Sequence, residues 1–192
     1  MKPRLRYFGL KWRAIGWLVL GRRQAALEVF QQMLLEFPGD PYALASKAQV
    51  LAQLGRRDDA LATQRELLQT AAAQGAHWFN YGFMLEQAED WEGAEAAFRR
   101  ATELSPGLDR AWYGLGLVLV RLGRLEEAVG AFKHNTRLQP MSPYGWYQLA
   151  RVHAERQEQE EARKIMRHLH RFEPKVAAQL ERETGIALPR LG

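Results

Sequence analysis

Side chains that could do chemistry are few in this sequence, and their spacing does not suit catalysis or metal binding. No two histidines are four residues apart, the helical spacing that brings two imidazoles to one metal ion, and the last two fall on different faces of a helix. The acidic run at 158–161 fits the solvated first turn of a helix better than a paired general acid and base. The histidines are His77, His134, His153, His168 and His170.

The remaining chemical motifs are also missing. The chain has no cysteine, which excludes disulfides and thiolate metal sites. The glycines fall at turns and helix contacts and form no phosphate-binding loop, and no nucleophile stands beside a base at a suitable spacing. We therefore expect a protein that is not an enzyme and that holds no metal and no cofactor. Its 192 residues, 47% apolar and 26% charged, are typical of one folded domain or a short repeat array.

Positive charge is concentrated at the N-terminus. Residues 1–23 hold seven lysines and arginines and no acid, although the whole chain carries only +5. Such a segment fits an acidic partner, an anionic membrane surface or nucleic acid, and equally a solvated helix start. Because the rest of the chain is slightly acidic, nucleic acid is not expected. The cations are Lys2, Arg4, Arg6, Lys11, Arg13, Arg22 and Arg23.

The longest apolar run, residues 14–21, is well short of the roughly 20 residues of a membrane-spanning helix. It follows a basic stretch as a signal peptide would, but no small-residue cleavage pattern follows it. We expect a cytoplasmic protein, with peripheral attachment to the inner membrane as the alternative location.

A repeat of 34 residues organises the sequence, most plainly in a column of alanines at positions 26, 60, 94, 128 and 162. Within the unit 109–142, Trp112, Leu115, Gly116 and Leu119 occupy one face of a helix, and a second amphipathic stretch over 125–138 follows the stop at Gly123. Each unit is therefore predicted to be a helical hairpin. Such hairpins bury their apolar faces only by stacking on one another, which predicts an all-α solenoid.

Three further columns predict how the hairpins pack. A small residue recurs in the first helix, and we expect it to let two helix backbones approach closely while the large residue four positions earlier fills the space beside the contact. The large residues are Leu10, Leu44, Trp78, Trp112 and Trp146, the small ones are Ala14, Ala48, Gly82, Gly116 and Ala150, and the column in the second helix holds Phe30, Gln64, Phe98, Phe132 and Met166.

The run from Trp112 to Gly116, followed by Ala128, Phe132 and Pro140, resembles a tetratricopeptide repeat. The resemblance covers five units, 7–40, 41–74, 75–108, 109–142 and 143–176. It implies a single domain over 1–192, a right-handed α-solenoid of five hairpins, with a capping helix over 175–184 and a tail over 185–192. The unit 41–74 departs from the pattern at Gln64 and Ala72, where Phe and Pro are usual, so its second helix is predicted to continue to Gly75.

In the family that the chain resembles, the first helices of successive units line a concave groove. Applied to this sequence, the resemblance implies a partner-binding stripe rich in aromatic residues and arginines, the types enriched at binding hot spots. The stripe holds Tyr42, Gln49, Phe79, Asn80, Phe83, Arg110, Tyr113, Leu117, Arg121, Tyr144, Tyr147 and Arg151. Its composition favours a peptide with apolar side chains and some acidic character. A specialised form of the family clamps a C-terminal carboxylate, and this chain has only Asn80 and Arg110 of that set.

Two functions are therefore predicted. The first is a non-enzymatic scaffold or adaptor that binds a protein or peptide partner in the concave groove. The alternative is a peripheral membrane scaffold that uses the basic, tryptophan-containing N-terminal helix. On that helix Phe8, Trp12, Ile15 and Val19 have no intramolecular cover, and this face fits a partner, lipid or a second copy of the chain.

Overall fold

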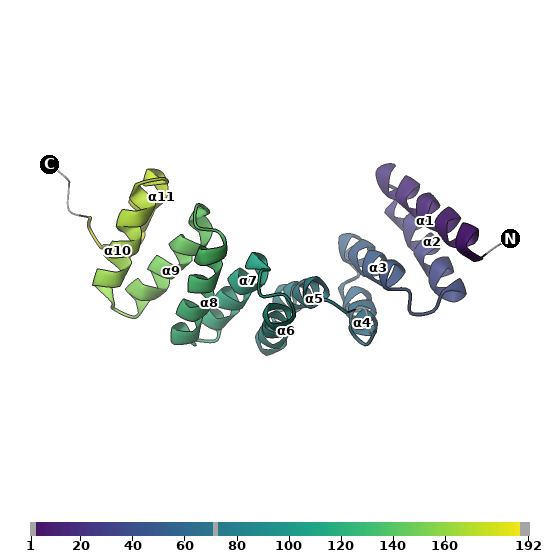
Figure 1. Cartoon of the computed structure of the whole chain (residues 1–192), viewed down its shortest axis with the longest axis horizontal. Helices are drawn as coiled ribbons and strands as arrows, with labels where there is room; N and C mark the ends of the chain where they lie inside the picture. Colours follow the sequence, from purple (N-terminus) through teal and green to yellow (C-terminus); the bar gives the residue numbers. More distant parts are fainter. Residues whose placement is uncertain (1–2, 71–72, 189–192) are drawn as a thin grey trace.

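The computed structural model describes residues 3–70 and 73–188, and the regular structure within them is entirely helical. The helices follow one another along an elongated, arched array whose two termini lie at opposite ends (Figure 1). Their bounds are α1 Pro3–Val19, α2 Arg23–Glu36, α3 Pro41–Gln53, α4 Arg57–Leu68, α5 Gly75–Gln87, α6 Trp91–Leu104, α7 Asp109–Arg121, α8 Leu125–Leu138, α9 Pro143–Glu155, α10 Gln159–His170 and α11 Pro174–Thr184.

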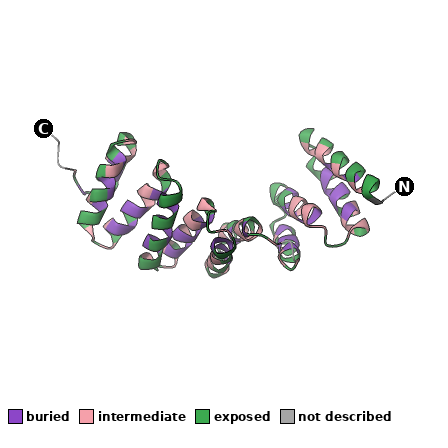
Figure 2. Ribbon diagram, viewed as in Figure 1, coloured by how far each residue is buried: buried purple, intermediate pink, exposed green. Residues whose placement is uncertain are grey.

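The helices form five antiparallel hairpins, as the repeat predicts, and each hairpin packs on the next. The second helix of one unit contacts the first helix of the following unit, and α11 covers α9 and α10 at the C-terminal end. Buried residues lie on the helix faces that meet, and exposed residues lie on the outward faces (Figure 2). The array therefore has a layer of first helices (α1, α3, α5, α7, α9) and a layer of second helices (α2, α4, α6, α8, α10).

Close helix contact depends on the small-residue column, and an aromatic ring from the second helix covers it. A Cβ atom placed on Gly116 would lie 2.5 Å from the Phe132 ring, and one on Gly82 would lie 2.9 Å from the Phe98 ring. The large residues of the first helices pack beside this contact: the leucines of their column are buried, and its tryptophans are half-buried against the core. Trp112 is only half-buried; its indole N–H donates to the Pro106 carbonyl at 2.8 Å and its ring stacks on His134.

Helix ends follow the residues that the sequence offers. Asp40 accepts a hydrogen bond from the Ala43 N–H at 2.8 Å and so caps α3. Gly123 and Gly185 follow α7 and α11 with φ of 72° and 69°, the left-handed conformation that glycine adopts without strain. The predicted capping helix over 175–184 is confirmed as α11, which begins one residue earlier.

The predicted extension of the helix in unit 41–74 is wrong, because α4 ends at Leu68. Its last turn tightens, since the Thr70 N–H and the Thr70 hydroxyl both bond the Leu67 carbonyl, at 3.0 and 2.7 Å. A threonine hydroxyl that bonds nearby backbone competes with continued helix. Residues 71 and 72, through which the extension was predicted to run, lie outside the described residues.

The array has a discontinuity between α4 and α5. The buried core divides there into one cluster over α1–α4 and a second over α5–α11. Helix α5 begins at Gly75, which packs closely on α6 and the residue after it. A Cβ atom at Gly75 would clash with the Ser105 side chain and would lie 2.9 Å from the Ala101 carbonyl oxygen. The His77 ring accepts the Gln74 N–H at 3.0 Å, and burial lowers the pKa of His77.

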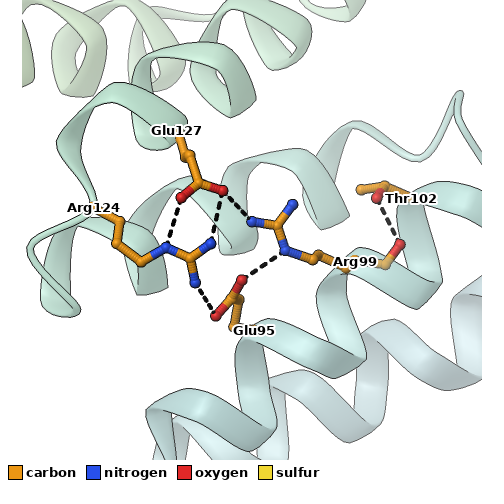
Figure 3. A network of polar contacts seen from close by, with 5 residues as sticks. All are labelled: Glu95, Arg99, Thr102, Arg124 and Glu127. Atoms are coloured by element: carbon orange, nitrogen blue, oxygen red, sulfur yellow. Dashed lines mark hydrogen bonds and ion pairs between the residues drawn. The ribbon is translucent and has the colours of Figure 1, made fainter.

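A ring of four ionic side chains joins α6 to α8 (Figure 3). Arg99 lies 2.6 Å from both Glu95 and Glu127, and Arg124 lies 2.6 Å from Glu95 and 2.7 Å from Glu127. Each charge thus has two partners of opposite sign. The hydrogen bonds from Arg124 and then Arg99 lower the pKa of Glu127.

The ring predicts a pH dependence of stability. Because the folded pKa of Glu127 is lowered, its contribution is complete above the ordinary glutamate pKa of 4.5 and is lost as the pH falls through the lowered value. We expect Glu127→Gln to reduce the free energy of unfolding at neutral pH, and the difference from wild type to shrink as the pH falls below 4.5. Urea unfolding at several pH values measures this. Glu103→Gln, which removes one exposed pair with Arg100, is the control and should have a smaller effect at neutral pH. A difference that does not change with pH would contradict the assignment.

Candidate functional site

A groove of about 550 Å³ opens between the first helices α3 and α5, and α4 forms its floor. It lies in the layer of first helices, where the sequence places the binding stripe. Its lining is almost uncharged. The lining residues are Ala45, Ser46, Gln49, Ala52, Gln53, Arg57, Ala60, Leu61, Gln64, Asn80, Phe83, Met84 and Gln87.

The groove exists because Gln64 stands where neighbouring units have phenylalanine. Phe98, 34 residues later, fills the space between its own hairpin and the next one, and a Cβ atom on Gly114 would lie 2.8 Å from its ring. One repeat earlier, the residues that correspond to Phe98 and Gly114 are Gln64 and Asn80, and both line the groove. Gln64 is buried, and its side-chain N–H donates to the His77 carbonyl at 2.8 Å, which satisfies the amide and leaves the volume of a ring unfilled.

The groove combines one exposed aromatic ring with several amides. Phe83 has 51% of its surface exposed, a large fraction for a phenylalanine. Gln49, Asn80 and Gln87 are exposed beside it, and Arg57 is the single charged side chain of the lining. A carboxamide both donates and accepts hydrogen bonds, as a peptide group does. The groove can therefore bind the main chain of an extended peptide and one apolar side chain.

Of the twelve residues in the predicted stripe, the groove collects Gln49, Asn80 and Phe83. The other aromatics of the stripe, apart from Tyr144, are half-buried and pack on other units or on the second helix of their own unit. Tyr144 is 71% exposed and Leu117 is half-buried, and both lie outside the groove. The packed aromatics are Tyr42, with Lys11 4.0 Å above its ring, Phe79 against Phe98, Tyr113 against Phe132, and Tyr147, whose hydroxyl donates to Glu183 at 2.5 Å.

The three arginines of the stripe are exposed, and each guanidinium lies over an aromatic ring. Arg110 is 5.2 Å from the Phe79 ring, Arg121 is 5.8 Å from that of Trp91, and Arg151 is 5.7 Å from that of Tyr147. Burial raises the pKa of Glu86, and Arg121 opposes that rise. The charge of Arg121 is thus partly compensated within the chain, whereas Arg110 has no acidic partner within 4.0 Å among the described residues.

Sequence reasoning missed several lining residues, although the repeat contains the signal for some of them. Gln53 and Gln87 occupy the register position of Arg121, and Ser46 occupies that of Asn80, so the same column rule selects them. Arg57, Ala60 and Leu61 belong to a second helix, and only the three-dimensional packing brings them to the groove.

Across residues 3–70 and 73–188, no three histidine, aspartate or glutamate side chains gather into a group that could hold a metal ion. In the same residues, no helix combines the length and the hydropathy that crossing a membrane requires.

Three family models, each described as a tetratricopeptide repeat, match residues 20–80, 85–134 and 143–168, together more than half of the chain. No curated protein matches the sequence. Several solved structures share the fold at low sequence identity. MamA has a TM-score of 0.78 at 17% identity, with 97% of each chain covered.

Two further structures are similar to this chain. YrrB, described as a tetratricopeptide repeat protein with an unusual peptide-binding site, has a TM-score of 0.77 at 19% identity, with 88% of each chain covered. A tetratricopeptide repeat protein from Parabacteroides merdae has a TM-score of 0.80 at 17% identity, with 93% of this chain and 73% of that chain covered.

The origin of the groove predicts a coupling between Gln64 and Asn80. Gln64→Phe alone forces a ring against Asn80 and should lower the free energy of unfolding by about 1–3 kcal/mol. Asn80→Gly alone should lower it by up to about 1 kcal/mol, because glycine weakens a helix. The double variant recreates the pairing of Phe98 with Gly114, so we expect it to be more stable than the sum of the single changes by about 1–3 kcal/mol. Urea unfolding of the four proteins measures this coupling, and strictly additive changes would contradict it.

Proposed function

Because this chain belongs to the tetratricopeptide repeat family, whose members are protein interaction scaffolds, we propose that it binds an extended peptide segment of a partner protein in the groove around Phe83. The observation that carries the proposal is the groove itself, which is apolar at Phe83 and Met84 and rich in amides around them. The fold shared with YrrB, whose description includes a peptide-binding site, supports the same class of ligand.

Each side of the groove has a separate part in this proposal. Phe83 packs against one apolar side chain of the peptide, since an exposed aromatic ring gains free energy when it is covered. Gln49 on α3 and Asn80 on α5 face the groove from its two walls and pair with peptide N–H and carbonyl groups. Amides from two walls suit an extended strand, whose hydrogen-bonding groups alternate between its two edges.

The stripe beyond the groove extends the proposed contact towards the C-terminus. Arg110 and Arg151 are exposed on α7 and α9, and Tyr144 offers an exposed ring at the start of α9. These residues favour a partner with acidic residues outside the part that enters the groove. Electrostatic attraction of this kind raises the association rate more than the affinity and weakens with salt.

Partner capture with a paired control tests the groove. We expect the double variant Phe83→Ala, Asn80→Ala to retain at least roughly tenfold less partner from a lysate of the source cells than wild type, because it removes the ring and one amide wall. The control is Leu35→Ala, which removes an 84% exposed apolar side chain from α2, in the other layer. Mass spectrometry identifies the retained proteins. Equal retention by wild type and the double variant, with both folded by circular dichroism, would overturn the groove assignment.

A second candidate function uses helix α1. Leu5, Phe8, Trp12 and Val19 are 63%, 51%, 68% and 81% exposed, and together with half-buried Ile15 they recur at intervals of three and four residues. This apolar stripe runs along a helix that also carries exposed Arg4, Arg6 and Arg13. An apolar stripe flanked by arginines is suited to the interface of an anionic membrane. The opposite face of the helix, with Leu10 and Ala14, is buried in the array and cannot contact a membrane.

Vesicle sedimentation tests this second function. We expect wild type to bind vesicles that contain anionic lipid, to dissociate from them as the salt concentration is raised, and not to bind purely zwitterionic vesicles. Trp12→Ser with Phe8→Ser should weaken binding roughly tenfold or more, because each ring contributes more than about 1 kcal/mol. Leu35→Ala is again the control. Equal sedimentation of wild type and the double variant would contradict membrane binding by this stripe. If wild type binds no vesicles and the double variant loses self-association, membrane binding is rejected and the stripe is assigned to contact with a second copy of the chain.

A further inference from the structure

A second cavity, of about 520 Å³, opens in the other layer of the array, between the second helices α8 and α10, with α9 as its floor. It shares no residue with the groove around Phe83. We propose that this cavity is a separate binding site for an acidic peptide segment in which carboxylates flank one apolar side chain.

Cations surround the cavity. Lys133 and Arg137 are one turn apart on α8, Lys164 and Arg167 lie on α10, and Arg171 directly follows that helix. Glu161 is the single acid of the lining, and it lies 4.0 Å from Lys164. Among the described residues, Lys133, Arg137, Arg167 and Arg171 make no ion pair within 4.0 Å. The lining therefore carries a net positive charge that the chain itself does not neutralise.

The same surface one repeat earlier shows that this excess is not a general property of the array. There Arg99 occupies the position of Lys133 and belongs to the closed ring with Glu95, Arg124 and Glu127 (Figure 3). At the cavity, Val129 replaces Glu95 and Arg137 replaces Glu103, which removes two acids.

Glu158 replaces Arg124 at the cavity, but its carboxylate is already engaged. It accepts from His153 at 2.6 Å and from Arg156 at 2.8 Å. The hydrogen bond from His153 lowers the pKa of Glu158 most, and the charges of Arg156 and Lys133 lower it further, although Lys133 makes no ion pair with it within 4.0 Å. The acids of this joint thus leave most of the surrounding cations for a ligand.

The cavity also has apolar lining from α9 and α10, and it contains one polar atom without a partner. Trp146, Leu149 and Ile165 supply apolar surface. His168, whose ring centre is 4.5 Å from that of Trp146, has a buried Nε2 atom that makes no hydrogen bond. A buried polar atom without a partner is unfavourable, and a ligand that offers a hydrogen bond there would relieve it.

These features together select the ligand. An inorganic anion would pair with the cations and leave the apolar floor exposed, whereas a hydrocarbon would leave the cations unused. Lys164 and Arg171 are seven positions apart, about 10 Å at the rise of a helix, which is the length of about three residues of extended chain. An acidic peptide with a central apolar residue matches both the length and the mixed lining.

Fluorescence anisotropy with a labelled peptide tests the proposal. The probe has one leucine flanked by two aspartates on each side, and two control peptides carry asparagine for aspartate or alanine for leucine. We expect Arg137→Gln with Arg167→Gln to weaken binding of the probe roughly tenfold at low salt, with the loss shrinking as salt screens the charges. Lys175→Gln with Arg182→Gln removes the same charge from α11, outside the cavity, and should leave binding unchanged.

Two further variants separate this site from the groove. Glu161→Gln should strengthen binding of the probe, because it removes the single acid of the cavity lining. Phe83→Ala, in the groove, should not alter it.

Imidazole signals in NMR spectra of the wild-type protein give a second readout. We expect the probe to shift the signals of His168 and to leave those of His134, at the same position one repeat earlier, unchanged. Equal binding of the asparagine peptide, or equal binding by the Arg137→Gln, Arg167→Gln variant, would overturn the proposal. Equal binding of the alanine peptide, with full competition by tripolyphosphate, would also overturn it in favour of a general anion site.

Discussion

The structure depends on one steric constraint, the contact between an aromatic ring on the second helix of a unit and a residue without a large side chain on the first. Phe98 lies against Gly82 and Gly114, and Phe132 lies against Gly116, at distances that leave no room for even one added carbon. Neither the ring nor the glycine can change alone, because the interior is packed as densely as a crystal. The contact sets the spacing within each hairpin and, through Gly114, between one hairpin and the next.

The candidate site arises where this constraint is relaxed. Gln64 replaces the ring, and its hydrogen bond to the His77 carbonyl joins α4 to α5, as does the hydrogen bond from Arg65 to the Tyr81 hydroxyl. An amide does not fill the volume of a phenyl ring, so the buried core divides at this joint and a groove opens beside it. The same substitution thus explains both the weakest point of the core and the cavity in the layer of first helices. A repeat array can accept one such joint because each unit contacts only its neighbours.

The sequence predicts most of the fold but only part of the candidate site. The 34-residue period, the glycine at 123 and the small-residue column are local signals, and they correctly predict the hairpins, the end of α7 and the packing faces. The end of α4 was missed because Thr70 offers the backbone a local hydrogen bond that competes closely with one more helical turn.

The site was harder to predict because side-chain partners come from distant residues. The 34-residue repeat shows that Tyr113 and Tyr147 occupy the same position of their units, but not that Phe132 and Glu183 are their neighbours. Gln64 was visible as a departure from the repeat, yet its effect on the volume between α3 and α5 appears only when both helices are placed. Internal comparison between units therefore indicates where a site lies better than residue type does.

Two neighbouring joints in the layer of second helices differ in charge, and the difference follows from what stabilises each joint. Between α8 and α10 the apolar residues Leu149, Met166 and Leu169 are buried, so the joint does not need ion pairs to hold it. Exposed ion pairs contribute little to stability in any case. Replacing Glu95 of the ring by Val129 one repeat later therefore leaves the fold intact while it changes what the surface attracts. In a scaffold of repeated units, positions that contribute least to packing are the ones at which recognition can change from one unit to the next.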